Sequence, residues 1–255
     1  MMPYQHGGEH KKVKENLYEY LAGNEYPGRG ICIGKTPGGK KAMIAYFIMG
    51  RSVNSRNRVF DPIDGGIRTV AADPSKMTDP HLIIYNPVLT LGNTTIVTNG
   101  DQTDTIRNFI AADICPGYGF EAALNTRTFE DDGPNWTPRI SGVIDMRMGG
   151  YKLSILKSDN GNENSVQRFT FDYPQPLAGE GHFISTYKCN GDPIPSFEGE
   201  PLCVAMKEED PDKYAGRLWK ALNKDNKVSL FVRAIDLATQ VYKDVIINKY
   251  KTVEE

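Results

Sequence analysis

Three arginines and an asparagine follow directly on a strongly apolar segment of the chain. Residues 42–49 are wholly apolar, and Arg51, Arg56, Asn57 and Arg58 come next. Arginine guanidinium groups match phosphate and carboxylate oxygens through paired hydrogen bonds. The cluster is therefore a credible anion site at the end of a strand, although on charge alone a solvated loop with paired charges is the favoured explanation.

Polar side chains also stand at the ends of two further predicted strands. Tyr85 and Asn86 end one apolar segment, and Asn99 ends the next, just before Thr103 and Asp104. These groups could face a ligand. Oxygen atoms in such positions also cap the first turn of a helix, a role that requires no ligand.

The remaining candidates are an acidic and a positively charged residue separated by a short loop. Glu130 opens an acidic group, and Arg139 follows it in the segment Thr-Pro-Arg. A carboxylate can accept a proton, and an arginine can hold an anion. The chain contains no G-x-S-x-G, Walker A, EF-hand or H-E-x-x-H pattern, so these familiar catalytic and phosphate-binding signatures give no alternative assignment.

The cysteines and histidines are scattered along the chain. Structural zinc sites take four nitrogen or sulfur ligands, usually in closely spaced pairs. No C-x-x-C pair occurs, and the cysteines lie at 32, 115, 189 and 203, the histidines at 6, 10, 81 and 182. The spacing predicts reduced structural cysteines and argues against zinc or iron–sulfur ligation.

Length and charge place the chain among ordinary globular proteins. It has 255 residues and a net charge of −2, which offers no general attraction for nucleic acid or an anionic membrane. The longest apolar run is too short to span a bilayer, and the N-terminal residues lack the apolar stretch of a signal peptide. We expect a cytoplasmic protein.

The candidate residues stand on a succession of short strands interrupted by helices. Apolar residues at 13, 17 and 21 predict a helix that ends near Gly23, within an N-terminal extension covering 1–24. Strands are expected at 30–34 and 42–49, which the turn 36–41 would join as an antiparallel hairpin, and at 81–86, 94–99, 140–146, 151–157, 166–171, 183–187 and 228–235. Helices are expected around 106–110, 120–124, 212–223 and through about 249, and a loop at 158–165. This order predicts an α+β protein with two stacked antiparallel sheets and helices outside, in a single domain over 25–255.

Several segments combine into a more specific pattern than any of them gives alone. They are Tyr26-Pro-Gly-Arg29, Ala45-Tyr46 with Arg51-Ser52 and Arg56, Tyr85-Asn86, Asn-Gly-x-x-Thr-Asp-Thr-Ile over 99–106, Glu130, Thr-Pro-Arg-Ile over 137–140 and Ile-Ser-Thr-Tyr over 184–187. In order and approximate spacing, the chain from about 25 to 190 resembles the archaeal-type IMP cyclohydrolase family. The resemblance implies an Ntn-hydrolase-like fold, a four-layer αββα sandwich. It also implies closure of 5-formamidoimidazole-4-carboxamide ribonucleotide to inosine monophosphate (IMP) with loss of water, the last step of purine nucleotide synthesis.

The resemblance also suggests residue roles. It implies that Arg56 stabilises the formyl oxyanion or orients the carboxamide, that Tyr85 donates to the reacting oxygen and that Glu130 accepts the proton of the attacking nitrogen. Substrate contacts are expected from Arg51, Asn57, Asn86, Asn99, Thr103, Asp104 and Arg139. The implied partners are the purine ribonucleotide substrate and the IMP product, with no cofactor, metal, nucleic acid or membrane. A homo-oligomer stays open.

Two other functions remain compatible with the same residues. One is an amide-acting enzyme of the same fold with a different substrate, because a fold does not fix a function. The other is a purine-nucleotide-binding regulatory protein that keeps the phosphate site and lacks the chemistry. The extension and the segment after about 190 lie outside the matched pattern.

Overall fold

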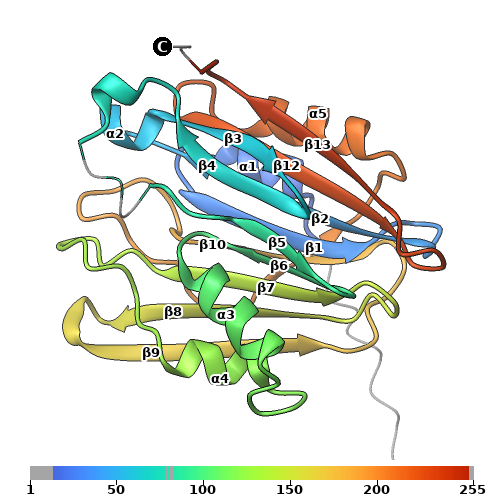
Figure 1. Ribbon diagram of the computed structural model, residues 1–255. Coiled ribbons are helices and arrows are strands. Elements are labelled where there is room, and N and C mark those ends of the chain that lie inside the picture. Colours follow the sequence, from blue (N-terminus) through green and yellow to red (C-terminus); the bar gives the residue numbers. More distant parts are fainter. Residues whose placement is uncertain (1–13, 79, 81–82, 253–255) are drawn as a thin grey trace, which may run out of the picture.

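Two antiparallel sheets stack face to face in the computed structural model, which describes residues 14–78, 80 and 83–252 (Figure 1). The six-stranded sheet has the order β11 (Leu202–Ala205), β10 (Glu180–Ser185), β1 (Arg29–Lys35), β2 (Lys41–Met49), β12 (Lys227–Asp236) and β13 (Tyr242–Asn248). The seven-stranded sheet runs in chain order through β3 (Arg58–Ile63), β4 (Gly66–Ala71), β5 (Val88–Leu91), β6 (Thr94–Thr98), β7 (Arg139–Asp145), β8 (Tyr151–Asp159) and β9 (Asn162–Tyr173).

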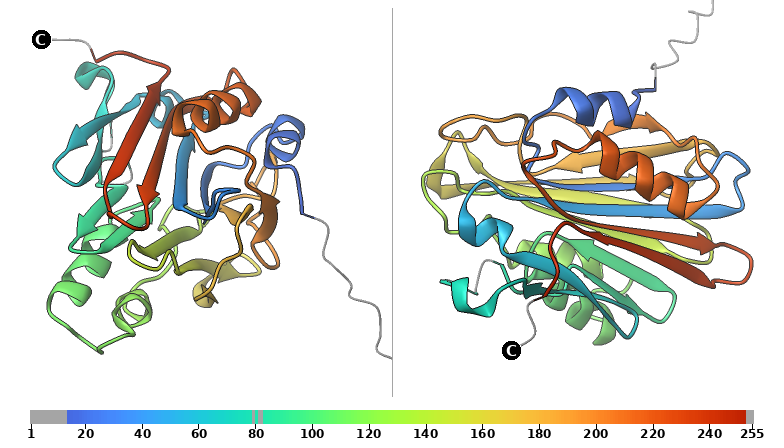
Figure 2. Two further views of the ribbon diagram at one scale, coloured as in Figure 1. Left: turned by 90° about the vertical axis from the view of Figure 1, so that its right-hand side faces the viewer. Right: turned by 90° about the horizontal axis from the view of Figure 1, so that it is seen from above.

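Helices cover the outer face of each sheet (Figure 2). α1 (Leu17–Gly23) and α5 (Pro211–Ala221) pack on the six-stranded sheet, and α3 (Gln102–Ala111) and α4 (Gly119–Asn125) pack on the seven-stranded one. Two short elements, α2 (Val53–Arg56) and the 3₁₀ turn η1 (Pro74–Lys76), lie in connections. The predicted α+β sandwich with helices outside is confirmed, while its classification as Ntn-hydrolase-like stays a prediction.

Side-chain alternation explains why the central strands are apolar throughout. In β1, Ile31 and Ile33 point between the sheets, whereas Cys32 between them points toward α1 and α5. Successive residues of a strand face opposite sides, so a strand covered on both faces needs apolar residues at every position. The buried run 42–49 of β2 follows the same rule, and the predicted hairpin of β1 and β2 is confirmed.

Two sequence-based expectations near the C-terminal half are wrong. The segment predicted as a helix through about 249 is strand β13, whose β-branched residues Val245, Ile246 and Ile247 pair with β12. The predicted loop 158–165 is a tight hairpin turn, because Asn160 and Gly161 adopt positive φ angles of 51° and 76° and let β8 continue into β9.

Two differences occur in the first half. The expected strand 81–86 falls partly outside the described residues, and its described part, 83–86, is a turn in which Ile83 and Ile84 donate to the carbonyl of Pro80. The hairpin of β3 and β4 was not expected. It is joined by Asp64 and Gly65, and Gly65 has a φ of 71° that favours glycine.

The N-terminal helix is present as α1. Asn16 caps it by accepting a hydrogen bond from the Tyr18 amide, and Leu17 and Leu21 are buried against the helical side of the six-stranded sheet. Val13, expected in the same helix, lies outside the described residues. The division into an extension over 1–24 and a domain over 25–255 stays a prediction. None of the helices in the described part of the chain has the length and apolar character needed to cross a bilayer.

Candidate active site

A cleft of about 290 Å³ opens at one end of the sandwich, where β1 and β3 begin and β2 ends. We call it the terminal cleft. Its walls include Tyr26, Arg29, Arg51, Arg58, Glu130 and Tyr187. Charged side chains in such a position are unusual because burying a charge is costly unless a partner compensates it.

Strand alternation directs two arginines into the terminal cleft. Arg29 stands two residues before Ile31 in β1, and Arg58 stands two residues before Phe60 in β3. Residues two apart in a strand share a face, so both guanidinium groups enter the space between the sheets. Arg29 is 9% exposed and Arg58 is 1% exposed. In each of these two strands, one from each sheet, the apolar residues that point between the sheets are therefore preceded by a buried arginine.

Gly28 allows the chain to approach Arg29 closely. It has a φ of 77°, and a Cβ atom built on it would lie 2.2 Å from Thr186 Oγ1 and 2.5 Å from the Tyr187 ring. The Arg29 amide donates to Thr186 Oγ1 at 3.1 Å, which fixes the start of β1 against the end of β10. A larger residue at 28 would displace Arg29 from the cleft wall.

Glu130 is the buried acid that faces these arginines. Its Oε2 lies 3.4 Å from Arg29 Nη2, and its Oε1 accepts from Asn99 Nδ2 at 3.4 Å. Asn99 is in turn held by the Pro138 carbonyl and by the Ile140 amide, at 2.9 and 2.8 Å. Burial raises the pKa of Glu130 above its ordinary value, although the charges of Arg29 and Arg139 act in the opposite direction. A carboxyl with a raised pKa is suited to exchange protons near neutral pH.

The two arginines direct unused donors into this region. Among the described residues, Arg29 Nε and Arg58 Nη1 are buried and have no hydrogen-bond partner. Buried polar groups are nearly always paired, so such orphan donors call for an explanation. Two N–H groups beside a carboxylate are an arrangement that can hold an oxygen atom on which negative charge develops.

Tyrosines complete the polar lining behind and beside the arginines. Tyr46 Oη and Tyr85 Oη are 2.8 Å apart and form a buried hydrogen bond. Tyr187 Oη lies 2.5 Å from Thr137 Oγ1, which lies 2.5 Å from Asp132 Oδ2. Since the threonine hydroxyl has one proton, it donates to Asp132 and accepts from Tyr187. This relay fixes the Tyr187 ring on the cleft wall.

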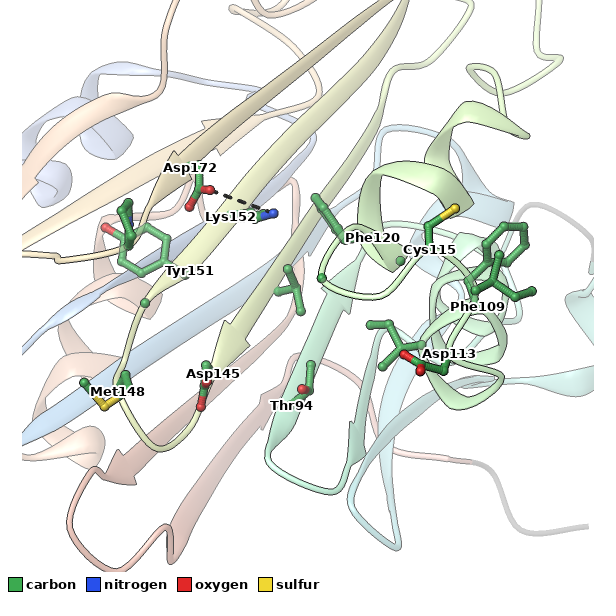
Figure 3. Close-up of a pocket in the computed structure, with 17 residues that line it drawn as sticks. Thr94, Phe109, Asp113, Cys115, Phe120, Asp145, Met148, Tyr151, Lys152 and Asp172 are labelled. Atoms are coloured by element: carbon green, nitrogen blue, oxygen red, sulfur yellow. Dashed lines mark ion pairs between the residues drawn. The ribbon is translucent and has the colours of Figure 1, made fainter.

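A second and larger cavity lies on the opposite side of the seven-stranded sheet. It has a volume of about 440 Å³ and lies between α3, the α3–α4 connection and the outer faces of β7 and β8 (Figure 3). We call it the helical groove. Phe109, Phe120 and Val143 contribute apolar walls. Lys152 also lines the groove, and its ammonium group is already paired with Glu121 at 2.5 Å and with Asp172 at 3.8 Å.

Comparison with known proteins identifies the family of the chain and covers nearly all of its sheets and helices. Residues 26–240 match a family model described as IMP cyclohydrolase-like protein. The chain belongs to the IMP cyclohydrolase-like family. A relative named IMP cyclohydrolase from Methanococcus aeolicus is 32% identical over 166 residues, covering 64% of this chain and 75% of the relative. Another of the same name, from Methanopyrus kandleri, is 24% identical over 210 residues and is covered to 98% of its length.

Of the residues given a role by the family pattern, Glu130 and Arg51 line the cleft. Asn99 contacts Glu130 from behind the wall, and Tyr85 is buried near Arg29 and Arg58 without lining the cleft itself. Arg51 stands at the mouth, where its guanidinium lies 5.1 Å from the Tyr26 ring centre and donates to Asn190 Oδ1 at 2.7 Å.

Arg139 approaches from the side of α3. It donates to Asp101 and to Gln102, at 2.7 and 2.8 Å, and its charge also reaches Glu130. Thr103 is buried beside it and shares hydrogen bonds with Thr98 and the Gly100 carbonyl. Both residues support the loop that carries Asn99.

The other sequence-predicted residues are not part of the cleft wall. Arg56 ends α2 and donates to the Gly50 carbonyl and to Asn226 Oδ1, at 2.8 and 3.0 Å. The Asn57 side chain exchanges hydrogen bonds with the backbone of Asp73, and both Arg56 and Asn57 line a different surface cavity. Asp104 pairs with Arg107 on the exposed side of α3. Asn86 is half-buried and also absent from the cleft lining.

Sequence reasoning assigned no role to Arg29 and Arg58, although both stood within segments that it had singled out. The usable signal was their position two residues before a buried apolar residue, which places them on the inward face of a strand. Arg56 is only two residues from Arg58, but it lies at the end of a helical turn and points elsewhere.

Proposed function

We propose that the chain is an IMP cyclohydrolase that closes 5-formamidoimidazole-4-carboxamide ribonucleotide to IMP in the terminal cleft. The observation that carries the proposal is a buried carboxyl, Glu130, facing two buried arginines that retain orphan donors. Membership of the family supports the substrate, because the relatives from both methanogens are named for this activity. We further propose that the protein works in the cytoplasm.

The reaction is an addition followed by a dehydration. The carboxamide nitrogen attacks the formyl carbon, forming a carbon–nitrogen bond while the formyl oxygen takes the electron pair. Protonation of that oxygen and loss of a proton from nitrogen give a cyclic carbinolamine. Its hydroxyl group then leaves with a proton as water. Both reacting groups are amides, so catalysis must come from orientation, stabilisation of the oxyanion and proton transfer.

The two arginines are suited to bind the formyl oxygen. Their orphan donors, Arg29 Nε and Arg58 Nη1, are fixed by burial before a substrate arrives. Preorganised donors stabilise developing charge without a further cost of reorientation. In this proposal Arg29 and Arg58, rather than Arg56, stabilise the oxyanion, and Tyr85 assists through its hydroxyl group.

Glu130 is suited to move the protons. Its raised pKa lets the carboxylate accept the proton of the attacking nitrogen and return it to the departing hydroxyl. Asn99 orients it through a bond to Oε1, while Arg29 holds Oε2. The acid is thereby held at both oxygens and exchanges its proton in a defined direction.

The remaining wall residues are suited to hold the rest of the nucleotide. Arg51, at the mouth, offers a guanidinium for the phosphate. Tyr26 and Tyr187 stack on one another with ring centres 5.8 Å apart and present aromatic surface for the base. We assign Asn57, Thr103 and Asp104 to support of the surrounding loops, because their hydrogen bonds and ion pairs are internal.

An absorbance assay of IMP formation tests the function directly. Purified protein is mixed with the formylated ribonucleotide in the presence of EDTA, and turnover well above the spontaneous rate is expected. Absence of turnover together with a rise in Tm on adding IMP would instead favour a non-catalytic nucleotide-binding protein. Absence of both would favour an amide-acting enzyme with another substrate.

A further inference from the structure

Three side chains with metal-binding atoms meet at the edge of the six-stranded sheet. Glu180 and His182 are two residues apart in β10 and therefore share a face of that strand. Cys203 of β11 is the direct register partner of His182. The sequence alone does not show this group, because Cys203 is 21 positions from His182 and reaches it only through the antiparallel pairing of β10 and β11.

The ligand atoms of these three residues are close enough to share one ion. One atom from each, a carboxylate oxygen, an imidazole nitrogen and the cysteine sulfur, lies within 4.8 Å of the other two. Zinc bonds of about 2.0–2.3 Å in tetrahedral geometry place donors roughly 3.4–3.7 Å apart. Side-chain movements of about 1 Å would close the remaining difference.

Two tyrosines fix the histidine ring. His182 Nδ1 lies 2.7 Å from Tyr151 Oη, and the Tyr173 ring stacks on the imidazole with centres 3.8 Å apart. A metal-binding histidine typically engages its second nitrogen with a hydrogen-bond partner, which sets the tautomer and the ring orientation. The Tyr151 contact therefore assigns metal binding to Nε2.

We propose that Glu180, His182 and Cys203 form a zinc site that clamps β11 to β10. A thiolate, an imidazole and a carboxylate suit Zn²⁺ better than Mg²⁺ or Ca²⁺, which prefer oxygen ligands. On binding, the thiol of Cys203 releases its proton to solvent as sulfur bonds to the metal. Lys14, whose ammonium lies 2.9 Å from Glu180, gives up that ion pair, and water fills the fourth position.

The proposed site is structural and separate from the terminal cleft. His182 lies in β10 and Tyr187 lies two residues beyond the end of that strand, which places them five residues apart in the sequence, or roughly 16 Å if the chain stays extended. β11 is the outermost named strand of its sheet and is four residues long, and on its outer side Glu15 adds a single bridge to Val204. A metal bond across the β10–β11 pair would stabilise this edge without touching the reacting groups.

Cobalt(II) binding by the full chain tests the proposal. Co²⁺ is expected to bind at one ion per chain and to produce a thiolate-to-cobalt charge-transfer band, which zinc then displaces. Cys203→Ser is expected to abolish the band, and His182→Gln to weaken binding by more than the roughly 10- to 100-fold typical of an outer-shell change. Tyr151→Phe should weaken binding about 10-fold because the ring loses its fixed orientation.

Matched variants distinguish this site from adventitious binding. Cys115→Ser and Cys189→Ser remove exposed cysteines elsewhere and should leave the band intact. Zinc should raise the Tm of the parent protein but not that of Cys203→Ser, and circular dichroism checks that each variant is folded. A band that survives Cys203→Ser, or metal binding that depends on His6 and His10 instead, would overturn the proposal. Since cyclohydrolase turnover is measured in EDTA, its failure would leave the metal result unaffected.

Discussion

The terminal cleft and the helical groove differ in size and in chemistry, and the two differences run in opposite directions. The groove is larger, about 440 Å³ against 290 Å³, and much of its wall is apolar. Lys152 in the groove is paired with Glu121 and Asp172, whereas Arg29 Nε and Arg58 Nη1 in the cleft are buried without a hydrogen-bond partner among the described residues. Volume alone would favour the groove.

Uncompensated polar groups are the better guide to a reactive site. A buried arginine with an orphan donor reduces the stability of the folded protein, so its presence indicates a purpose other than stability. Beside the groove, Glu121 Oε2 is also buried without a hydrogen-bond partner, but it belongs to a carboxylate whose other oxygen pairs with Lys152. The predictions below follow from this contrast, beginning with the largest expected effect.

Replacing the buried acid should separate the two cavities most clearly. Glu130→Gln keeps the shape of the side chain but cannot accept a proton, and kcat/KM should fall about 100- to 10,000-fold. Asp172→Asn is the matched change in the helical groove and should leave kcat/KM unchanged. Steady-state kinetics on both proteins makes the comparison, and equal losses would remove the distinction.

The next largest effect is expected from Arg58. Arg58→Lys retains a positive charge but loses the forked donors, so kcat/KM should fall about 100-fold or more. Arg56→Lys, two residues earlier, alters a guanidinium bonded to Gly50 and Asn226 and should change kcat/KM little. A larger loss for Arg56 than for Arg58 would favour the assignment that follows from the sequence resemblance. Thermal unfolding checks that both variants fold.

The pH profile tests the environment of Glu130. Burial raises its pKa, so the proton-accepting carboxylate should be lost as pH falls through a midpoint above the ordinary value of 4.5. Below that midpoint kcat/KM should drop about tenfold per pH unit. The same limb should be missing from Glu130→Gln. An acid limb unchanged by that substitution would assign it to another group.

A smaller effect is expected from the tyrosine pair. Tyr85→Phe removes the hydroxyl group that we propose assists at the reacting oxygen, and a neutral hydrogen bond there is worth about 0.5–1.5 kcal/mol. The corresponding fall in kcat/KM is about 2- to 13-fold. Single-turnover kinetics would show whether the loss lies in the chemical step; an unchanged rate would place Tyr85 outside the mechanism.

The smallest effect should come from the rim of the helical groove. Ile114 and Met148 are exposed there, at 43% and 71%. Substituting either with Gln should change the free energy of unfolding by less than about 0.5 kcal/mol, because no buried contact is lost. Denaturant unfolding measures this, and kcat/KM should stay at the parent value. A marked loss of activity would mean that the groove takes part in function.

Sequence patterns predicted the layers of the fold better than the ends of its elements. The apolar run of β2 and the turn before it were sufficient to predict the central hairpin. The helix predicted at β13 is wrong because pairing with β12 decides the conformation of this segment, and that partner is not visible in the local sequence pattern. Residues 83–86 form a turn because the Ile83 and Ile84 amides donate to the Pro80 carbonyl and the Tyr85 amide donates to Thr69 Oγ1. The second bond comes from a residue 16 positions away, which a local pattern does not reveal.

The site was predictable where a residue's neighbours in sequence also fix its environment. Asn99 and Glu130 were singled out and lie in contact, although their loops come from different parts of the chain. Arg56 and Arg58 could not be separated by type or position in a cluster of arginines. Only the change from helical turn to strand between them decides which one enters the cleft.

The order of strands in the six-stranded sheet has a consequence for how the chain acquires its structure. The first hairpin, β1 and β2, is flanked by β10 and β12, which come from the last third of the sequence. The bond between Arg29 and Thr186 alone spans 157 positions. Contacts of such separation slow folding, and the hairpin's apolar faces stay uncovered while the ribosome finishes the remainder. A nascent chain would therefore depend on chaperones until its final strands emerge, and the cleft would be among the last features to form.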